Sequence, residues 1–261
     1  MLAEPERTPY DLNFRLFGFR VRIHPLFWLG TVILGLNALR QENGPIVLLI
    51  WVVVVFVSIL VHELGHALAY RMYRSDAHIV LWIFGGLAVG TPDVAGRKRR
   101  IFVSLAGPLA SLALFGIVYG SHLLTNWGIS HGELVADLYL SLFFVNLVWT
   151  ILNLFPVYPL DGGQVSRELC EGKWPGRGTR LSLQISFWFA VAVAVYCLAC
   201  ELDSRVLGRQ FISSIPLWAR GTAYTGILFG LLAFNSYQLL QYYRGRGYYY
   251  EGADDRLPWE K

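Results

Sequence analysis

The sequence predicts an all-α polytopic membrane protein with about six transmembrane helices and a small β-sheet at the cytoplasmic membrane surface. Of its 261 residues, 55% are hydrophobic and 15% are charged, and the mean hydropathy is +0.45. Several runs reach the length of about 20 apolar residues that crosses a bilayer. These values exclude an ordinary soluble domain, so we expect residues 1–261 to form a single membrane domain in contact with the lipid bilayer.

The N-terminal segment predicts a β element. Residues 14–23 alternate apolar and basic side chains with the period of a strand, and Gly18 can form the turn of a small hairpin. The polar stretch of residues 1–25 lacks the apolar core of a cleavable signal peptide. We therefore expect a hairpin at the membrane surface and no cleaved signal in this stretch.

Six apolar runs are candidate membrane spans. The run at 46–70 is long enough without qualification, whereas the first run, which begins at Pro25, is short unless it starts at Val21 or lies partly embedded. Pro156 and Pro159 argue against an unbroken helix at the end of the fourth run. The predicted spans are residues 21–39, 46–70, 101–124, 138–160, 181–199 and 222–240. Residues 46–165 hold three of them.

The segment between the second and third spans predicts a further strand. Residues 77–84 are β-branched and aromatic, are too few to cross a membrane as a helix, and stop at Gly85 and Gly86. This strand is a candidate partner for the N-terminal hairpin. In the third span, the small residues between Ala106 and Ser111 would let another helix approach closely.

The basic residues predict the orientation. They fall in the short segments between apolar runs and do not gather in one domain, so the net charge of +4 does not indicate a nucleic-acid partner. One set of alternate segments holds 18 of the 22 Lys and Arg residues: 1–24, 71–100, 161–180 and 241–261. The positive-inside rule then predicts a multi-pass protein of the inner cell membrane with both termini in the cytoplasm.

A metal-binding motif lies inside the second predicted span. The sequence HELGH places His62 and His66 one helical turn apart, so both rings can reach one metal ion, and Glu63 lies beside them as a candidate base. Ionisable side chains within a membrane span are functional by default, because they are costly unless they are satisfied. The motif therefore predicts a catalytic metal site near the cytoplasmic surface.

Asp161 is the best-placed candidate for a third ligand. Catalytic zinc takes three protein ligands and leaves a fourth position open, and Asp161 follows the fourth predicted span on the same side as the HELGH motif. Taken alone, Asp161-Gly162-Gly163 is more typical of a turn at the end of a helix. Beside a motif that needs an acid, the ligand interpretation is favoured.

Two motifs in this order resemble the site-2 protease family of intramembrane zinc metalloproteases. HELGH in one span and Asn153-Leu-Phe-Pro156-Val-Tyr-Pro-Leu-Asp161-Gly in a later one carry the resemblance. It implies one zinc ion per chain, bound by His62, His66 and Asp161, with Glu63 as the general base. It also implies substrate contacts for Asn153 and Pro156.

The resemblance also implies the type of protein and its substrate. The segments available are too short for a PDZ domain or paired CBS domains, so the compact prokaryotic type fits best. Such an enzyme would cleave the transmembrane segment of a single-span membrane protein, in regulated intramembrane proteolysis. A substrate helix must unwind to be cut, and the strand ending at Gly85 and Gly86 could accept it as an added strand. The alternative is that these glycines only form a turn.

Two other functions compete with a protease. A catalytically inactive relative could bind transmembrane helices as a scaffold, although His62, Glu63, His66 and Asp161 are all present. A metal transporter would need ionisable residues along several spans, and the fifth and sixth spans have almost none. The sequence indicates neither the oligomeric state nor the identity of the substrate.

Overall fold

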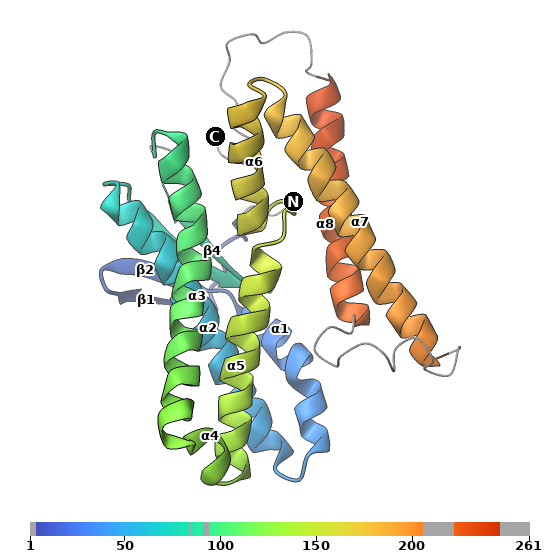
Figure 1. Ribbon diagram of the computed structural model, residues 1–261. Coiled ribbons are helices and arrows are strands. Elements are labelled where there is room, and N and C mark those ends of the chain that lie inside the picture. Colours follow the sequence, from blue (N-terminus) through green and yellow to red (C-terminus); the bar gives the residue numbers. More distant parts are fainter. Residues whose placement is uncertain (1–3, 84, 91–93, 206–221, 246–261) are drawn as a thin grey trace. The chain divides into compact units, whose positions relative to one another are not determined.

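The computed structural model describes residues 4–83, 85–90, 94–205 and 222–245. The chain divides into two compact units, an N-terminal unit that ends at Leu154 and a C-terminal unit that begins at Phe155 (Figure 1). The predicted three-span core therefore includes residues of both units. We describe each unit by itself.

A four-stranded sheet belongs to the N-terminal unit. Its strands are β1 (Leu12–Leu16), β2 (Phe19–Ile23), β3 (Ala77–Trp82) and β4 (Gly85–Gly90), in the order β1-β2-β3-β4. β1 and β2 form the predicted hairpin, and β3 pairs with β2 in parallel, which confirms the expected partnership. The alternative that Gly85 and Gly86 only form a turn is wrong, because both belong to β4 and pair with Trp82 and Leu81.

Three long helices and three short ones complete the N-terminal unit. They are α1 (Pro25–Gly35), the 3₁₀ helix η1 (Leu36–Arg40), α2 (Gly44–Met72), α3 (Arg97–Thr125), α4 (Trp127–Ser130) and α5 (Glu133–Asn153). The first span cannot start at Val21, because this residue lies in β2. Pro25 instead begins α1 and Nδ1 of His24 accepts a hydrogen bond from Leu26 N, so His24 caps the helix.

The C-terminal unit contains α6 (Asp161–Lys173), α7 (Gly178–Arg205) and α8 (Ala223–Gly245). α5 starts at Glu133, earlier than the predicted span 138–160, and it ends at Asn153, before Pro156 and Pro159, which confirms that these prolines interrupt the helix. Asp161 does not close that span but starts α6. Within this unit, Oγ of Ser186 lies 2.7 Å from Oγ of Ser236 and joins α7 to α8.

Four of the described helices are long and apolar enough to cross a membrane: α2, α3, α5 and residues 178–202 of α7. The helical segment Pro25–Arg40 is apolar but shorter. α8 forms where the sixth span was expected, yet it is not among these four. The protein is an integral membrane protein. The predicted number of six spans is approximate.

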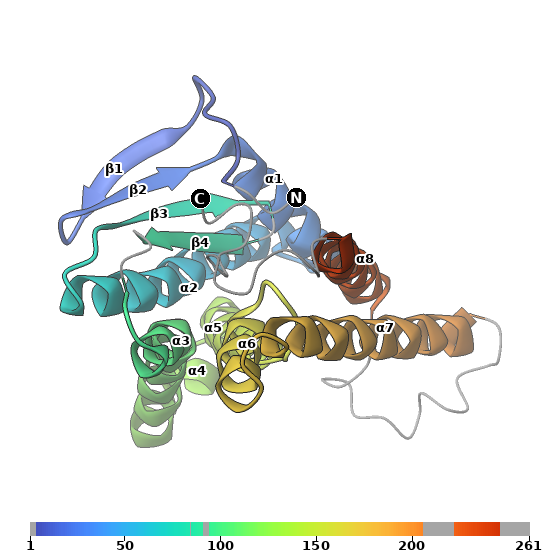
Figure 2. The ribbon, with the colours of Figure 1, turned by 90° about the horizontal axis from the view of Figure 1, so that it is seen from above.

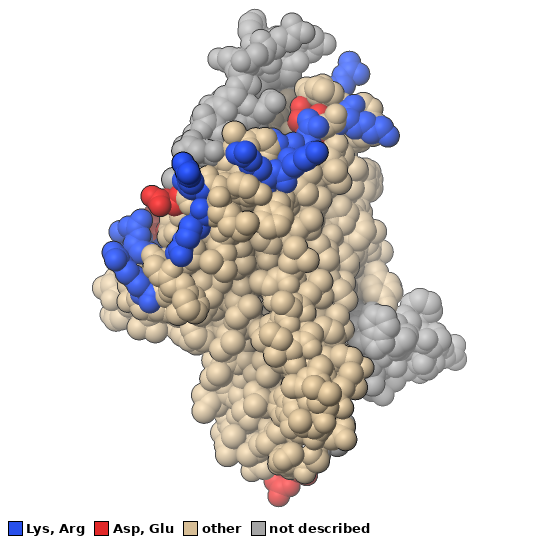
Figure 3. All heavy atoms as spheres, turned by 60° about the vertical axis from the view of Figure 1, so that its left-hand side comes forward, with Lys and Arg blue, Asp and Glu red and all other residues tan. Residues whose placement is uncertain are grey.

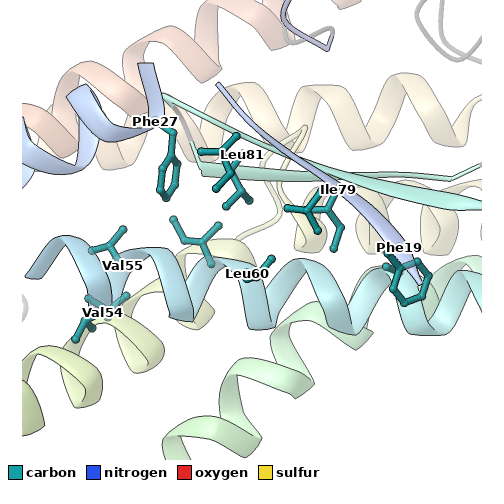
Figure 4. Packing of buried hydrophobic residues seen from close by; sticks show 12 residues of the cluster. Phe19, Phe27, Val54, Val55, Leu60, Ile79 and Leu81 are labelled. Carbon is teal, nitrogen blue, oxygen red and sulfur yellow. The ribbon is translucent and has the colours of Figure 1, made fainter. Parts of the chain in front are cut away.

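The core of the N-terminal unit lies between the sheet and α2. Figures 2 and 4 show the sheet against one side of this helix, with Phe19, Ile79 and Leu81 facing Val55 and Leu60. All five side chains are at most 8% exposed. This packing fixes the sheet beside the helix that carries the HELGH motif.

The opposite side of α2 packs closely against α3. A Cβ atom at Gly65 would collide with the carbonyl oxygen of Ala106 and lie 2.8 Å from Cβ of Ala110. The small residues of the third predicted span therefore allow the close approach that they predicted. The fourth residue of the HELGH motif, Gly65, is a glycine because α3 leaves no room for a side chain.

Candidate metal centre

His62 and His66 already have the separation of two ligands of one metal ion. Both side chains are buried on α2, and their Nε2 atoms are 3.2 Å apart. Two nitrogens bound to one tetrahedral zinc at about 2.0–2.1 Å would be about 3.3 Å apart. The HELGH spacing therefore gives the predicted convergence of the two rings.

The other ring nitrogen of each histidine has a partner on α3. Nδ1 of His62 lies 3.0 Å from Oγ of Ser111, and Nδ1 of His66 lies 2.7 Å from the carbonyl oxygen of Val103. Because a carbonyl only accepts hydrogen bonds, Nδ1 of His66 carries a proton, and the neutral ring keeps its lone pair on Nε2. Partners of this kind orient histidines that bind metals.

Gly107 on α3 faces the two Nε2 atoms. A Cβ atom here would collide with Nε2 of His66 and lie 2.7 Å from Nε2 of His62. An ion bound to both rings would lie in front of these same nitrogens. The donor atoms, their spacing and the glycine beside them thus fit a metal ion.

Glu63 is buried and lies against the edge strand β4. Its side chain is on the helix turn that carries the two histidines and is 4% exposed. A Cβ atom at Gly86 would collide with Cγ and Oε1 of Glu63 and lie 2.6 Å from Cδ. Only glycine lets the strand approach the carboxylate this closely. The structure therefore brings Gly86 and Glu63 together.

Gly85 is fixed by both its backbone and its neighbour. Its φ of +124° is strained for any other residue. A Cβ atom would also lie 2.7 Å from the indole ring of Trp149 on α5. Gly85, the first residue of β4, therefore packs directly against Trp149 of α5.

Asn146 joins α5 to α2, as expected for a polar residue in a membrane helix. Its Nδ2 donates a hydrogen bond of 3.0 Å to Oγ of Ser58, one turn before His62. Among the described residues, Oδ1 of Asn146 and Nε1 of Trp149 are buried without a hydrogen-bond partner. Buried polar atoms of this kind usually require a polar ligand or water.

The other predicted site residues lie at the end of α5 and in the C-terminal unit. Asn153 is the last residue of α5 and is buried, with Nδ2 donating to the carbonyl oxygen of Trp149. In the C-terminal unit, Pro156 is half-buried before α6 and Asp161 is buried in its first turn. The assignments of Asn153, Pro156 and Asp161 stay predictions.

Sequence reasoning missed the role of α3 in orienting the histidines. It assigned the small residues of this span to helix packing alone, whereas Gly107 and Ser111 also face the two rings. The available signal was their spacing, because residues four apart lie on one face of a helix. No sequence signal pointed to the carbonyl oxygen of Val103.

A model of peptidase family M50 matches residues 124–193 of the chain. The matched segment contains Asn153, Pro156 and Asp161 and lies after the HELGH motif. It covers the part of the chain in which the second predicted motif occurs.

Curated relatives and a solved structure extend this similarity. The chain is 32% identical over 164 residues to a putative zinc metalloprotease of Mycobacterium tuberculosis, which covers 59% of this chain and 42% of the relative. It is 27% identical over 202 residues to a zinc metalloprotease of Methanocaldococcus jannaschii, which covers 76% and 57%. The chain spans about half the length of these relatives. A site-2 protease from Methanocaldococcus jannaschii has a similar fold, with a TM-score of 0.53 at 21% identity over 95% of this chain and all of that one.

Proposed function

We propose that the chain is a zinc metalloprotease of peptidase family M50, the site-2 proteases, and that it cleaves peptide bonds within the membrane. The observation that supports this most directly is the His62–His66 pair, 3.2 Å apart on an apolar helix and oriented by α3. The HELGH motif is typical of zinc hydrolases, and here it lies inside a membrane-spanning helix, where ionisable residues are functional by default.

The proposed cofactor is one zinc ion per chain, held by His62, His66 and Asp161. All three are buried, and each offers one ligand atom. Two imidazoles and one carboxylate are a ligand set of catalytic zinc, which keeps a further position open. When bound, zinc would lower the pKa of water and polarise the peptide carbonyl.

Glu63 is the proposed general base. Its carboxylate accepts a proton from the attacking water and then passes this proton to the leaving amine nitrogen. Burial beside β4 holds the carboxylate in place. Replacement by glutamine would keep the size of the side chain and remove its ability to accept the proton.

The proposed place for the substrate backbone is the edge strand β4. In the described sheet, β4 pairs only with β3, so its other edge has no partner strand. An unwound transmembrane segment could add to this edge as a strand, beside Glu63, with Gly85 and Gly86 allowing close approach. Asn153 and Pro156 are proposed to contact the same segment.

The proposed substrates are single-span membrane proteins, cut in regulated intramembrane proteolysis. The distribution of Lys and Arg supports cytoplasmic termini in an inner membrane, with the histidines close to the cytoplasmic face. This depth would give water access to a site in the membrane. The competing function is a scaffold that binds transmembrane helices without cutting them.

The decisive experiment compares Glu63→Gln with Glu42→Gln, a matched change at an exposed residue. Both purified proteins should contain about one zinc ion. In proteoliposomes with a model single-span substrate, Glu63→Gln should lower cleavage by about 10²–10⁴-fold, whereas Glu42→Gln should cleave normally. Equal cleavage by both variants would contradict the role of Glu63. Substrate binding without cleavage by the zinc-loaded, unmodified chain would favour the scaffold.

A second pair of variants tests the third ligand. Asp161→Ala should lose the zinc ion, whereas Asp76→Ala, at an exposed residue, should keep it. Metal content by elemental analysis reads out this difference without any substrate. Full zinc content in the Asp161→Ala protein would remove Asp161 from the ligand set.

A further inference from the structure

The tip of the β1–β2 hairpin carries a residue that its backbone disfavours. Leu16 pairs with Phe19, so Phe17 and Gly18 form a two-residue turn, and their φ angles are +48° and +85°. Turns with two positive φ angles favour Asn-Gly or Gly-Gly. A bulky residue in this conformation costs about 1–2 kcal/mol. The ring of Phe17 does not offset this cost by burial, because the residue is 73% exposed.

Arg71 fixes this tip to the end of α2. Its Nη2 donates a hydrogen bond of 2.7 Å to the carbonyl oxygen of Phe17, and its guanidinium lies 3.6 Å from the centroid of the Phe19 ring. The exposed ring is therefore held at the end of a membrane-crossing helix. An exposed aromatic ring at such a position is typical of the membrane–water interface.

The outer strand β1 has an apolar face that the core does not cover. Leu12 and Phe14 lie on the face that Val21 and Ile23 bury in β2. They are nevertheless 54% and 39% exposed. Beside a membrane span, lipid is the apolar surrounding that can cover this face together with Phe17.

The opposite face of the hairpin holds two arginines side by side. Arg15 is the direct cross-strand partner of Arg20, which in turn is in register with His78 of β3. Neither arginine forms an ion pair with a described residue, whereas Arg22 and His78 both pair with Glu4. Like charges directly opposite on neighbouring strands repel each other. An anion bound between the two guanidinium groups would reverse this effect.

We propose that the β1–β2 hairpin is a binding site for acidic phospholipid headgroups. Arg15 and Arg20 bind the phosphate, and Phe17 with the apolar face of β1 contacts the acyl region. Figure 3 shows one face of the chain on which Lys and Arg gather next to a broad surface without charged residues, as expected where headgroups meet acyl chains. A lipid explains both the unfavoured phenylalanine and the arginine pair, whereas a free phosphate would explain only the second.

The test measures lipid binding by the full-length chain in detergent. Native mass spectrometry should detect tighter binding of phosphatidylglycerol than of phosphatidylcholine. Each arginine near a phosphate contributes about fivefold in affinity, so Arg15→Gln with Arg20→Gln should weaken phosphatidylglycerol binding by roughly thirtyfold. The control is Arg40→Gln, an exposed arginine in η1, which should leave binding within about twofold.

A second variant tests the hairpin tip. Phe17→Asn introduces a residue that the turn favours, so it should not lower the unfolding temperature, but it should weaken phosphatidylglycerol binding several-fold. Equal binding of both lipids by the unmodified chain would overturn the proposal. Equal losses in the double variant and in Arg40→Gln, or unchanged binding in Phe17→Asn, would also overturn it. So would binding of inorganic phosphate as tight as that of phosphatidylglycerol at the same concentration.

Discussion

Gly107→Ala should strongly weaken metal binding while leaving the helix intact. The added Cβ atom would lie 2.7 Å from Nε2 of His62 and would collide with Nε2 of His66. An ordinary contact begins at about 3.4 Å, so the His62 ring would have to move by about 0.7 Å. Ligand distances in metal sites hold within about 0.2 Å. The displacement is therefore several times larger than a bound zinc ion tolerates.

The expected magnitude follows from this geometry. Loss of an outer partner alone weakens metal binding by about 10–100-fold, and Gly107→Ala displaces the ligands themselves. We expect zinc affinity to fall by about 100-fold or more, which corresponds to about 2.7 kcal/mol. In contrast, alanine in a helix interior is favoured over glycine by about 0.5–1 kcal/mol.

Competition with a chelator in detergent solution measures the zinc affinity, and thermal unfolding reports the fold. Gly116→Ala is the matched control, because it makes the same change in α3 at a position where a Cβ atom meets nothing within 4 Å. The reasoning is refuted if Gly107→Ala binds zinc as tightly as Gly116→Ala. A fully unfolded Gly107→Ala protein would equally contradict it, because the helix itself should gain stability.

Three further predictions concern the neighbours of the site and the N-terminal segment. Ser111→Ala removes the partner of a histidine Nδ1 and should weaken zinc binding by about 10–100-fold in the same competition assay. Gly65→Ala would push α3 away from α2, and thermal unfolding should show a loss of about 1–3 kcal/mol. Burial raises the pKa of Asp11, but hydrogen bonds from Thr8 and Arg22 outweigh it and leave this pKa below its ordinary value of 3.8. A lowered pKa stabilises the folded state above about pH 4, and this contribution is lost as the pH falls through the folded-state pKa. Unfolding curves between pH 7 and pH 3 should therefore show a smaller pH dependence in Arg22→Met, whereas the part that depends on the hydrogen bonds from Thr8 should remain.

The sequence predicted the elements whose patterns are strong and local. The apolar run around HELGH became α2, and the alternating residues around Gly18 became the β1–β2 hairpin. Both patterns depend on the geometry of one segment, a span length in one case and a period of two in the other. For the same reason, the spacing of His62 and His66 was enough to predict that their rings converge.

The elements that the sequence mispredicted depend on contacts between segments. Residues 85–90 read GGLAVG, which has little strand preference, and they form β4 because they pair with β3 and fit beside Glu63. Asp161 followed by two glycines is typical of a helix end, yet Asp161 begins α6, where a carboxylate is favoured by the helix dipole. In both cases the glycines indicated the end of an element, whereas in the structure a new element begins there: β4 at Gly85 and α6 at Asp161.

The partnership of α2 and α3 explains how a polar site can exist in an apolar part of the chain. A buried imidazole is costly in a membrane unless its nitrogens are satisfied. α3 supplies both outer partners, Oγ of Ser111 and the carbonyl oxygen of Val103, and its glycine leaves the inner nitrogens accessible to a ligand. Since both histidines come from one helix and both of their partners from the next, the two ligands are oriented within the N-terminal unit alone. Loss of Asp161, the proposed third ligand, should therefore leave the geometry of the His62–His66 pair unchanged.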